Sequence, residues 1–305
     1  MSFSQDIKTE IAGRKVTRPC CAKAASYAAA CFGRYFDTRG VVVQTELQPV
    51  ALFLRRMYQL SGITGTVEER ERGEGYIYEF AVKDPAEVEK MLELFGHTGQ
   101  EANLRINPKN LVCPGCVSCF IAAAFLCGGT ATDPKKEYTM EFTTSRFNLA
   151  KDFEALLAEH EFAPHRTQRK GTNVIYVKAS EQVEDLLTFM GASGAALALM
   201  SDKIYKDLRN KANRLTNCET ANMDKTAVAN VQVTRAIHYL QEKQAMDALS
   251  EQLREAARMR LEYPELSLAQ LAQKFEPPIS KSGLAHRMKK LETIAKQMQE
   301  REANV

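Results

Sequence analysis

The chain has 305 residues, of which 45% are hydrophobic and 26% are charged, and its 41 basic and 38 acidic side chains give a formal net charge of +3. These values are ordinary for a soluble globular protein of about two domains, and they exclude a chain too polar to build a core. Because the charge is nearly balanced, a surface that binds nucleic acid must come from a local cluster of cations.

The chain opens on a polar, amphipathic segment, residues 1–15, that lacks the apolar core of a secretory signal. The most apolar run, Phe120 to Leu126, is too short to cross a bilayer. We therefore expect a cytoplasmic protein without membrane contact, associated with the nucleoid if it binds DNA. In that compartment the eight cysteines are expected to be reduced thiols or metal ligands rather than a disulfide framework.

An internal repeat organises the first two thirds of the chain, with matched positions about 95 to 98 residues apart. Each copy begins with a helix of small residues that runs into glycine, at Ala24–Gly33 and at Ala122–Gly129. Each copy also contains a strand followed by a helical pattern, the strands being Tyr76–Val82 and Val174–Lys178. The repeat predicts two αβ halves, residues 1–110 with an N-terminal helix and residues 111–195, in which strand, helix, strand, strand and helix follow the small-residue helix.

A helical linker is expected over residues 196–245, where turn-forming residues are almost absent. Five cations lie within residues 203–214 and are candidates for phosphate contacts, namely Lys203, Lys206, Arg209, Lys211 and Arg214. The alternative is an ordinary solvated helix face. The polar stretch from Asn213 to Asn222 could also be a capped break between two helices.

The tail, residues 246–305, has its own helical pattern. Ser267 precedes an apolar helix pattern and Gln270 lies three residues on, which is the signature of a capping box. The prolines at 277 and 278 end that helix, and Ser280 can cap a second one. A short capped helix, a turn and a basic second helix are typical of a helix-turn-helix, here over about residues 266–299.

The second of these helices has an apolar stripe that includes Leu284 and Met288, and a basic face without acids up to Leu291. We expect its N-terminal end, where the residues are small or polar, to enter the major groove. A helical bundle with a solvated lysine face is the alternative interpretation. The candidate DNA-binding residues are Lys281, Ser282, Gly283, His286, Arg287, Lys289 and Lys290.

The spacing of Cys113, Cys116 and Cys119 suits a zinc ion or an iron–sulfur cluster, and Cys127 and the pair at 20–21 could supply further ligands. Cys119 and Cys127, however, fall in an apolar helix and have the character of small core residues. No histidine lies near in sequence. We therefore expect no metal, no cofactor and no cysteine nucleophile.

The two glycine-terminated helices resemble the motif helices of the LAGLIDADG homing endonucleases, most clearly at Ala124–Thr130. The resemblance implies two helices packed at a pseudo-two-fold axis, two sheets that form a saddle over DNA, and a metal-binding carboxylate at each helix end. Here Gly128 occupies the acid position of the second motif. When Gly40 is aligned with the last glycine of the first motif, Arg39 occupies the position where the family has an acid. Asp37 lies nearby but out of register. We expect no catalytic residues.

The whole chain resembles the WhiA family of bacterial sporulation and cell-division regulators. The resemblance is carried by the opening residues 1–12, the cysteine pair 20–21, residues 124–130, residues 209–226 and the segment 277–283. It implies an α+β fold, with a duplicated LAGLIDADG-like body joined to a C-terminal all-α helix-turn-helix domain. It also implies that the helix-turn-helix is the main DNA-binding element and that the protein is not an enzyme.

The function expected from the sequence is sequence-specific transcription regulation at double-stranded promoter DNA, in cell division, chromosome segregation or sporulation. Two alternatives stay open, an interaction scaffold whose body binds a protein partner and an active homing endonuclease. The turn at residues 164–170 is basic whereas its counterpart at 68–72 is mixed in charge, although a working saddle should present cations from both halves. This asymmetry predicts a body with weakened DNA affinity.

Overall fold

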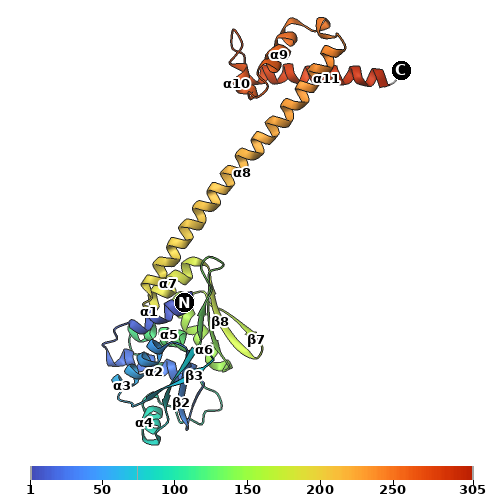
Figure 1. The fold of residues 1–305 in the computed structure, drawn as a ribbon. Helices are drawn as coiled ribbons and strands as arrows, with labels where there is room; N and C mark the ends of the chain where they lie inside the picture. The colour runs from blue at the N-terminus through green and yellow to red at the C-terminus, as the bar shows by residue number, and fades with distance from the viewer. Residues whose placement is uncertain (1, 74, 304–305) are drawn as a thin grey trace. The chain divides into compact units, whose positions relative to one another are not determined.

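The computed structural model describes residues 2–73 and 75–303, and the chain divides into two compact units, one ending at residue 207 and the other beginning at residue 208 (Figure 1). The first unit mixes helices and sheets, whereas the described part of the second contains helices alone. The expected α+β class, with an αβ body and a helical C-terminal domain, is confirmed.

Both halves of the first unit follow the same order of helix, two strands, helix, two strands and helix. The first half consists of α2 (Pro19–Phe32), β1 (Tyr35–Asp37), β2 (Gly40–Thr45), α3 (Gln48–Leu60), β3 (Thr66–Arg72), β4 (Gly75–Val82) and α4 (Pro85–Phe95). The second consists of α5 (Pro114–Gly128), β5 (Gly129–Ala131), β6 (Thr139–Thr144), α6 (Phe147–Glu159), β7 (His165–Arg169), β8 (Thr172–Lys178) and α7 (Ser180–Met190). A 3-10 turn, η1 (Pro108–Asn110), lies between the halves.

Two antiparallel sheets with the same strand order confirm the duplication. Their orders are β1-β2-β4-β3 and β5-β6-β8-β7. Val43 lies opposite Phe80 in the first sheet, and Phe142 lies opposite Ile175 in the second. All four side chains are buried in the common core. The strands β1 and β5 were not expected, because three residues are too few to show an alternating pattern.

Helices α2 and α5 lie side by side at the centre of the first unit (Figure 1). Alanine dominates the middle of both helices, at residues 28–30 and 122–124, and these side chains are all buried. Small side chains let two helix backbones approach closely. Larger rings surround this contact, as where the Tyr27 and Phe120 ring centroids lie 5.7 Å apart.

The N-terminal helix α1 (Phe3–Gly13) contacts the second half of the unit although it precedes the first half in sequence. The Ser4 hydroxyl donates to the Ala131 carbonyl over 2.9 Å, and Arg14 donates to the Met190 carbonyl over 3.1 Å. Glu10 accepts hydrogen bonds from the backbone N–H groups of Gly194 and Ala195, which lie in the first turn of the long helix that begins at Ser193. The first helix therefore contributes to the fold of both halves.

The helix α8 (Ser193–Glu242) runs without interruption through the expected linker. The suggested break at residues 213–222 is wrong. Neither glycine nor proline occurs from residue 195 to residue 242, so nothing stops the helix. Among its described side chains, none between residues 200 and 232 is buried, whereas both ends contribute to a core.

The second unit contains the C-terminal end of α8, a 3-10 turn η2 (Met246–Ala248), α9 (Glu251–Glu262), α10 (Leu268–Ala272) and α11 (Lys281–Ala303). Its core draws on Val233, Ile237 and Leu240 of α8. This helical domain therefore begins earlier in the chain than the boundary at residue 246 that the sequence suggested. None of the described helices combines the length and apolar character that crossing a membrane requires.

Candidate nucleic-acid interface

The helix-turn-helix is held together by the apolar stripe of α11 against α9 and α10. Leu284, Met288 and Leu291 of α11 are buried with Leu271 of α10 and Ala256 of α9. This is the packing that the spacing of the stripe predicted. Because one face of α11 is fixed in this core, the opposite face is presented to solvent.

Side-chain caps set the turn between α10 and α11. Ser267 and Gln270 form the expected capping box at the start of α10. The Ser280 hydroxyl accepts the Gly283 N–H over 3.0 Å and so caps α11. The segment before α10 is held by the buried Arg260, whose Nη1 donates to the Leu266 carbonyl over 2.7 Å. The start of α11 thus has a defined position in the domain.

Most of the predicted contact residues lie on the solvent face of α11, whereas Lys281 lies at its start in line with Met288. The side chains of Lys281, Ser282, His286, Lys289 and Lys290 are exposed, and Gly283 is half-buried. Arg287 differs from the other cations. Its guanidinium lies 5.7 Å from the centre of the Phe275 ring and 3.7 Å from a Glu255 oxygen, so it is held against its own domain.

The N-terminal end of α11 favours an anion. A helix N-terminus carries a partial positive charge from its free N–H groups, and α11 has no acidic residue in its first turn. Lys281 adds a full charge there. A Cβ built on Gly283 would lie 3.1 Å from the Ser280 Oγ, so a larger residue here would crowd the capping hydroxyl.

The cations of α8 fall into two groups. Lys203 forms ion pairs with Glu181 over 2.6 Å and with Glu184 over 3.7 Å. The Lys206 ammonium lies 5.1 Å from the centre of the Tyr138 ring. Both are engaged by the first unit and are poorly placed to serve a phosphate. The remaining three candidates have exposed side chains, namely Arg209, Lys211 and Arg214.

The outer face of the first sheet carries carboxylates among its cations. Glu79 lies on this face, opposite Gln44 and Glu68 in the register and away from the core. Lys83 binds Glu79 over 2.9 Å, and Arg70 lies 3.8 Å from it. The hydrogen bonds from Lys83 and Gln44 lower the pKa of Glu79, so that it stays ionised.

The outer face of the second sheet repeats this arrangement. Residues 165–169, which the sequence placed in a basic turn, form β7, and Arg169 at its end binds Glu141 over 3.0 Å. On the same face, His165 lies against Tyr176, with ring centroids 5.4 Å apart. Arg70 and Lys83 beside the first sheet and Arg169 on the second are therefore already partnered by carboxylates, which would repel a phosphate backbone.

The structure corrects the register of the first motif helix. Gly33 caps α2 just as Gly129 caps α5, with its N–H donating to the carbonyl four residues earlier. The residue equivalent to Gly128 is therefore Phe32, not Arg39 as the sequence alignment suggested. A loose motif misled that alignment, because the two glycines at 33 and 40 are close in the chain.

The ends of α2 and α5 offer nothing to hold the divalent cation that an endonuclease of this fold requires. Among the described residues, those lining the cavity at this place include no aspartate or glutamate. Arg146 enters it instead and donates to the carbonyls of Cys31 and Gly33. A Cβ at Gly128 would lie 2.7 Å from the Thr143 carbonyl oxygen. The residues present therefore do not fit a metal.

Asp37, the remaining acid near the first motif, is bound by its neighbour. The Arg39 guanidinium donates to both of its carboxylate oxygens, one of them over 2.6 Å. These hydrogen bonds lower the pKa of Asp37. An acid engaged in this way by arginine is a poor ligand for a cation.

Comparisons with known proteins agree with the division of the chain into an αβ body and a helical C-terminal unit. The family model of the WhiA LAGLIDADG-like domain matches residues 117–209, and that of the WhiA C-terminal helix-turn-helix domain matches residues 212–295. The chain is 32% identical over 309 residues to a protein of Ruminiclostridium cellulolyticum named "Probable cell division protein WhiA", covering 98% of each chain.

One further relative in sequence and one solved structure are also similar to this chain. A protein of the same name from Thermoanaerobacter pseudethanolicus is 41% identical over 182 residues, which cover 60% of this chain but only 57% of that relative's length. The crystal structure of full-length WhiA from Thermotoga maritima has a TM-score of 0.61 with 20% sequence identity, over 97% of this chain and 99% of that one. It supports the fold of the whole chain.

The cap of α11 gives a testable consequence. Replacing Ser280 with alanine removes the acceptor for the Gly283 N–H, and we expect the domain to lose about 1 kcal/mol of unfolding free energy. Thermal and urea unfolding of the whole chain measure the loss. Ser250→Ala is the matched control, because Ser250 precedes α9 but its side chain makes no cap hydrogen bond, and it should change the stability by less than about 0.5 kcal/mol. An equal effect of both variants would show that the cap is not made.

Proposed function

The chain belongs to the WhiA family, and on that premise we propose that it is a sequence-specific, DNA-binding transcription regulator. The observation that carries the proposal is the N-terminal half of α11, where Ser282 and His286 are exposed on the face opposite the buried stripe and Lys281 is exposed at the helix start. We infer that this half enters the major groove of double-stranded promoter DNA.

The local energetics support this assignment. A lysine in the first turn opposes the helix dipole, and a glycine inside a helix costs up to about 1 kcal/mol relative to alanine. Both features weaken α11 at the place where Lys281 and Gly283 stand. A groove wall compensates for both, because phosphates attract the lysine and the glycine permits close approach.

We propose that the LAGLIDADG-like body has no nuclease activity. Hydrolysis of a phosphodiester by this fold needs carboxylates that hold a divalent cation and orient the attacking water. Phe32 and Gly128 stand at the two positions where the fold family has acids, and the Arg146 guanidinium lies where a cation would bind. The protein would thus use the endonuclease architecture without its chemistry.

The regulated genes are proposed from the relatives. A protein named "Probable cell division protein WhiA" matches this chain along its length, and we extend cell division to this chain as the regulated process. Chromosome segregation and sporulation are proposed from the sequence resemblance alone. Binding to promoters would place the protein at the nucleoid in the cytoplasm. The carboxylates on both sheet faces, Glu79 and Glu141 among them, favour a protein over DNA as partner of the body.

Nuclease activity can be tested directly. Supercoiled plasmid incubated with the purified protein and Mg²⁺ or Mn²⁺ should remain supercoiled, because the described residues lining the cavity at the ends of α2 and α5 include no carboxylate to bind the ion. Agarose gels report nicking, and an active homing endonuclease on its own target serves as positive control. Metal-dependent nicking that Asp37→Asn abolishes would contradict the proposal.

The recognition helix makes a sharper prediction. Lys289 and Lys290 lie about two turns into α11, where the helix passes the phosphate backbone. Alanine at either position should weaken binding to target and scrambled duplexes alike and reduce the salt slope by about one. Alanine at Ser282 or His286 should lower the preference for the target by about 1–3 kcal/mol for each lost base contact, with nonspecific affinity almost unchanged.

Fluorescence anisotropy at several salt concentrations measures both quantities, on duplexes selected from genomic fragments by the protein itself. Lys296→Ala is the matched control, since Lys296 is an exposed lysine in the C-terminal half of the same helix. It should change neither quantity. If Ser282→Ala and His286→Ala reduced binding to both duplexes equally, the N-terminal end of α11 would read no bases.

A further inference from the structure

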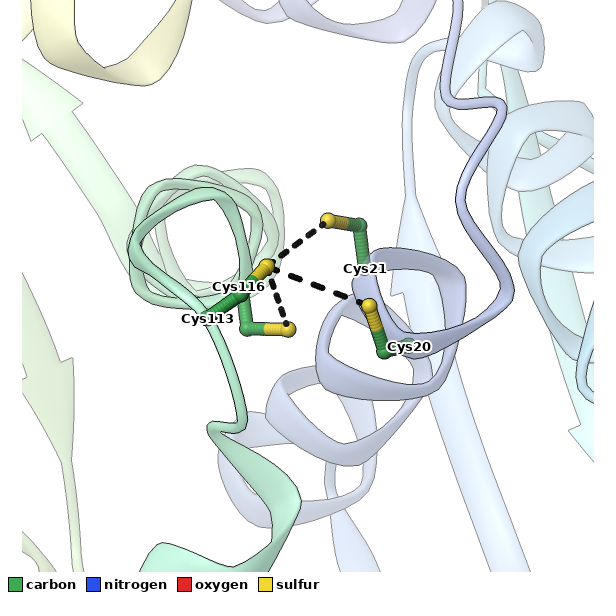
Figure 2. Close-up of side chains that lie close together, drawn as sticks. All are labelled: Cys20, Cys21, Cys113 and Cys116. Atoms are coloured by element: carbon green, nitrogen blue, oxygen red, sulfur yellow. Dashed lines mark hydrogen bonds between the residues drawn. The ribbon is translucent and has the colours of Figure 1, made fainter.

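Four cysteines from distant parts of the chain meet at one place in the first unit (Figure 2). Cys20 and Cys21 lie in the first turn of α2, whereas Cys113 immediately precedes α5 and Cys116 lies in its first turn. Their four sulfur atoms all lie within 4.8 Å of one another. The sequence suggested Cys113, Cys116 and Cys119 as a set, but Cys119 is outside this group.

The distances between the sulfur atoms match four ligands of a single ion. The Cys113 sulfur lies 3.4 Å from that of Cys116, 3.8 Å from that of Cys21 and 3.9 Å from that of Cys20. Four sulfur atoms bound at about 2.3 Å to one tetrahedral ion lie about 3.8 Å apart. A four-iron cluster holds its thiolates around its outer corners and therefore needs a wider arrangement.

The surroundings suit a cluster of thiolates. Both helices begin with proline, Pro19 and Pro114, so the cysteines gather at two helix N-termini, where the helix dipoles favour negative charge. A bound cation removes the cost of ionising the buried thiols.

The backbone also comes close to the cluster. A Cβ built on Gly115 would lie 3.2 Å from the Cys21 sulfur and 3.7 Å from the Cys113 sulfur. Glycine at this position keeps the space beside the sulfurs open. Cys20 and Cys113 are only partly buried, which leaves an entry path for an ion, while Cys21 and Cys116 are buried.

We propose that Cys20, Cys21, Cys113 and Cys116 form a tetrathiolate site for one zinc ion. Four protein ligands leave no open coordination position, so the site is structural rather than catalytic. Zinc is the occupant because a tetrahedral set of soft sulfur ligands at single-ion spacing selects it over oxygen-preferring cations. The ion would fasten the starts of α2 and α5, and with them the two halves of the body.

Metal analysis of the full-length protein, purified without a polyhistidine tag, tests the proposal. We expect one zinc per chain by inductively coupled plasma mass spectrometry. Cys113→Ser and Cys116→Ser should each reduce the zinc content at least tenfold. The matched controls are Cys31→Ala on α2 and Cys127→Ala on α5, which replace cysteines outside the group and should retain the metal.

A second measurement on the unaltered sequence covers the case in which a ligand variant fails to fold. Growth with Co²⁺ should give the thiolate-to-cobalt charge-transfer bands and the visible bands of a tetrahedral tetrathiolate site. Zinc content near zero in the unaltered protein, iron in place of zinc, or a Cys113–Cys116 disulfide in freshly prepared protein would overturn the proposal. An equal loss of zinc from the control variants would do so as well.

Discussion

Alanine side chains fill the contact between α2 and α5, and their small size lets the two helices pack closely at the centre of the body. Each sheet packs on this pair, because Phe80 of one sheet and Phe142 of the other are buried in the same core. The helix pair therefore fixes the spacing of the two halves. A larger side chain in the contact would separate the helices and disturb both sheets, since a close-packed core has little room to adjust.

The two ends of this helix pair have different chemistry. At the C-terminal ends, where a homing endonuclease holds its metal, Arg146 donates to the last carbonyls of α2 and the flanking positions hold Phe32 and Gly128. At the N-terminal ends, the first turns bring four thiols together. The contact between the two helices thus positions the residues at both ends, including the four thiols of the proposed zinc site. Neither end requires the body to bind DNA.

Much of the fold followed from sequence pattern. The stripe at Leu284 and Met288, the caps at Ser267 and Ser280, and the duplication were all readable from spacing. All four members of the cysteine group were among the candidates from the sequence, but so were Cys119 and Cys127. Two members lie more than ninety residues from the other two, and only the packing of α2 on α5 shows which thiols come together. The contact of Arg287 with the Phe275 ring could not be predicted either. Phe275 lies in the turn before α11, and helical periodicity gives no information about contacts with a turn.

The central claim is that the N-terminal half of α11 is the surface that reads DNA. Hydrogen–deuterium exchange of the full-length protein, with and without a duplex that it selects, tests this claim most directly. Slower exchange in the bound state is predicted for the amides of residues 281–290, with little change in β3, β4, β7 and β8. Protection of those strands without protection of α11 would contradict the account, because it would indicate that the LAGLIDADG-like body binds the DNA.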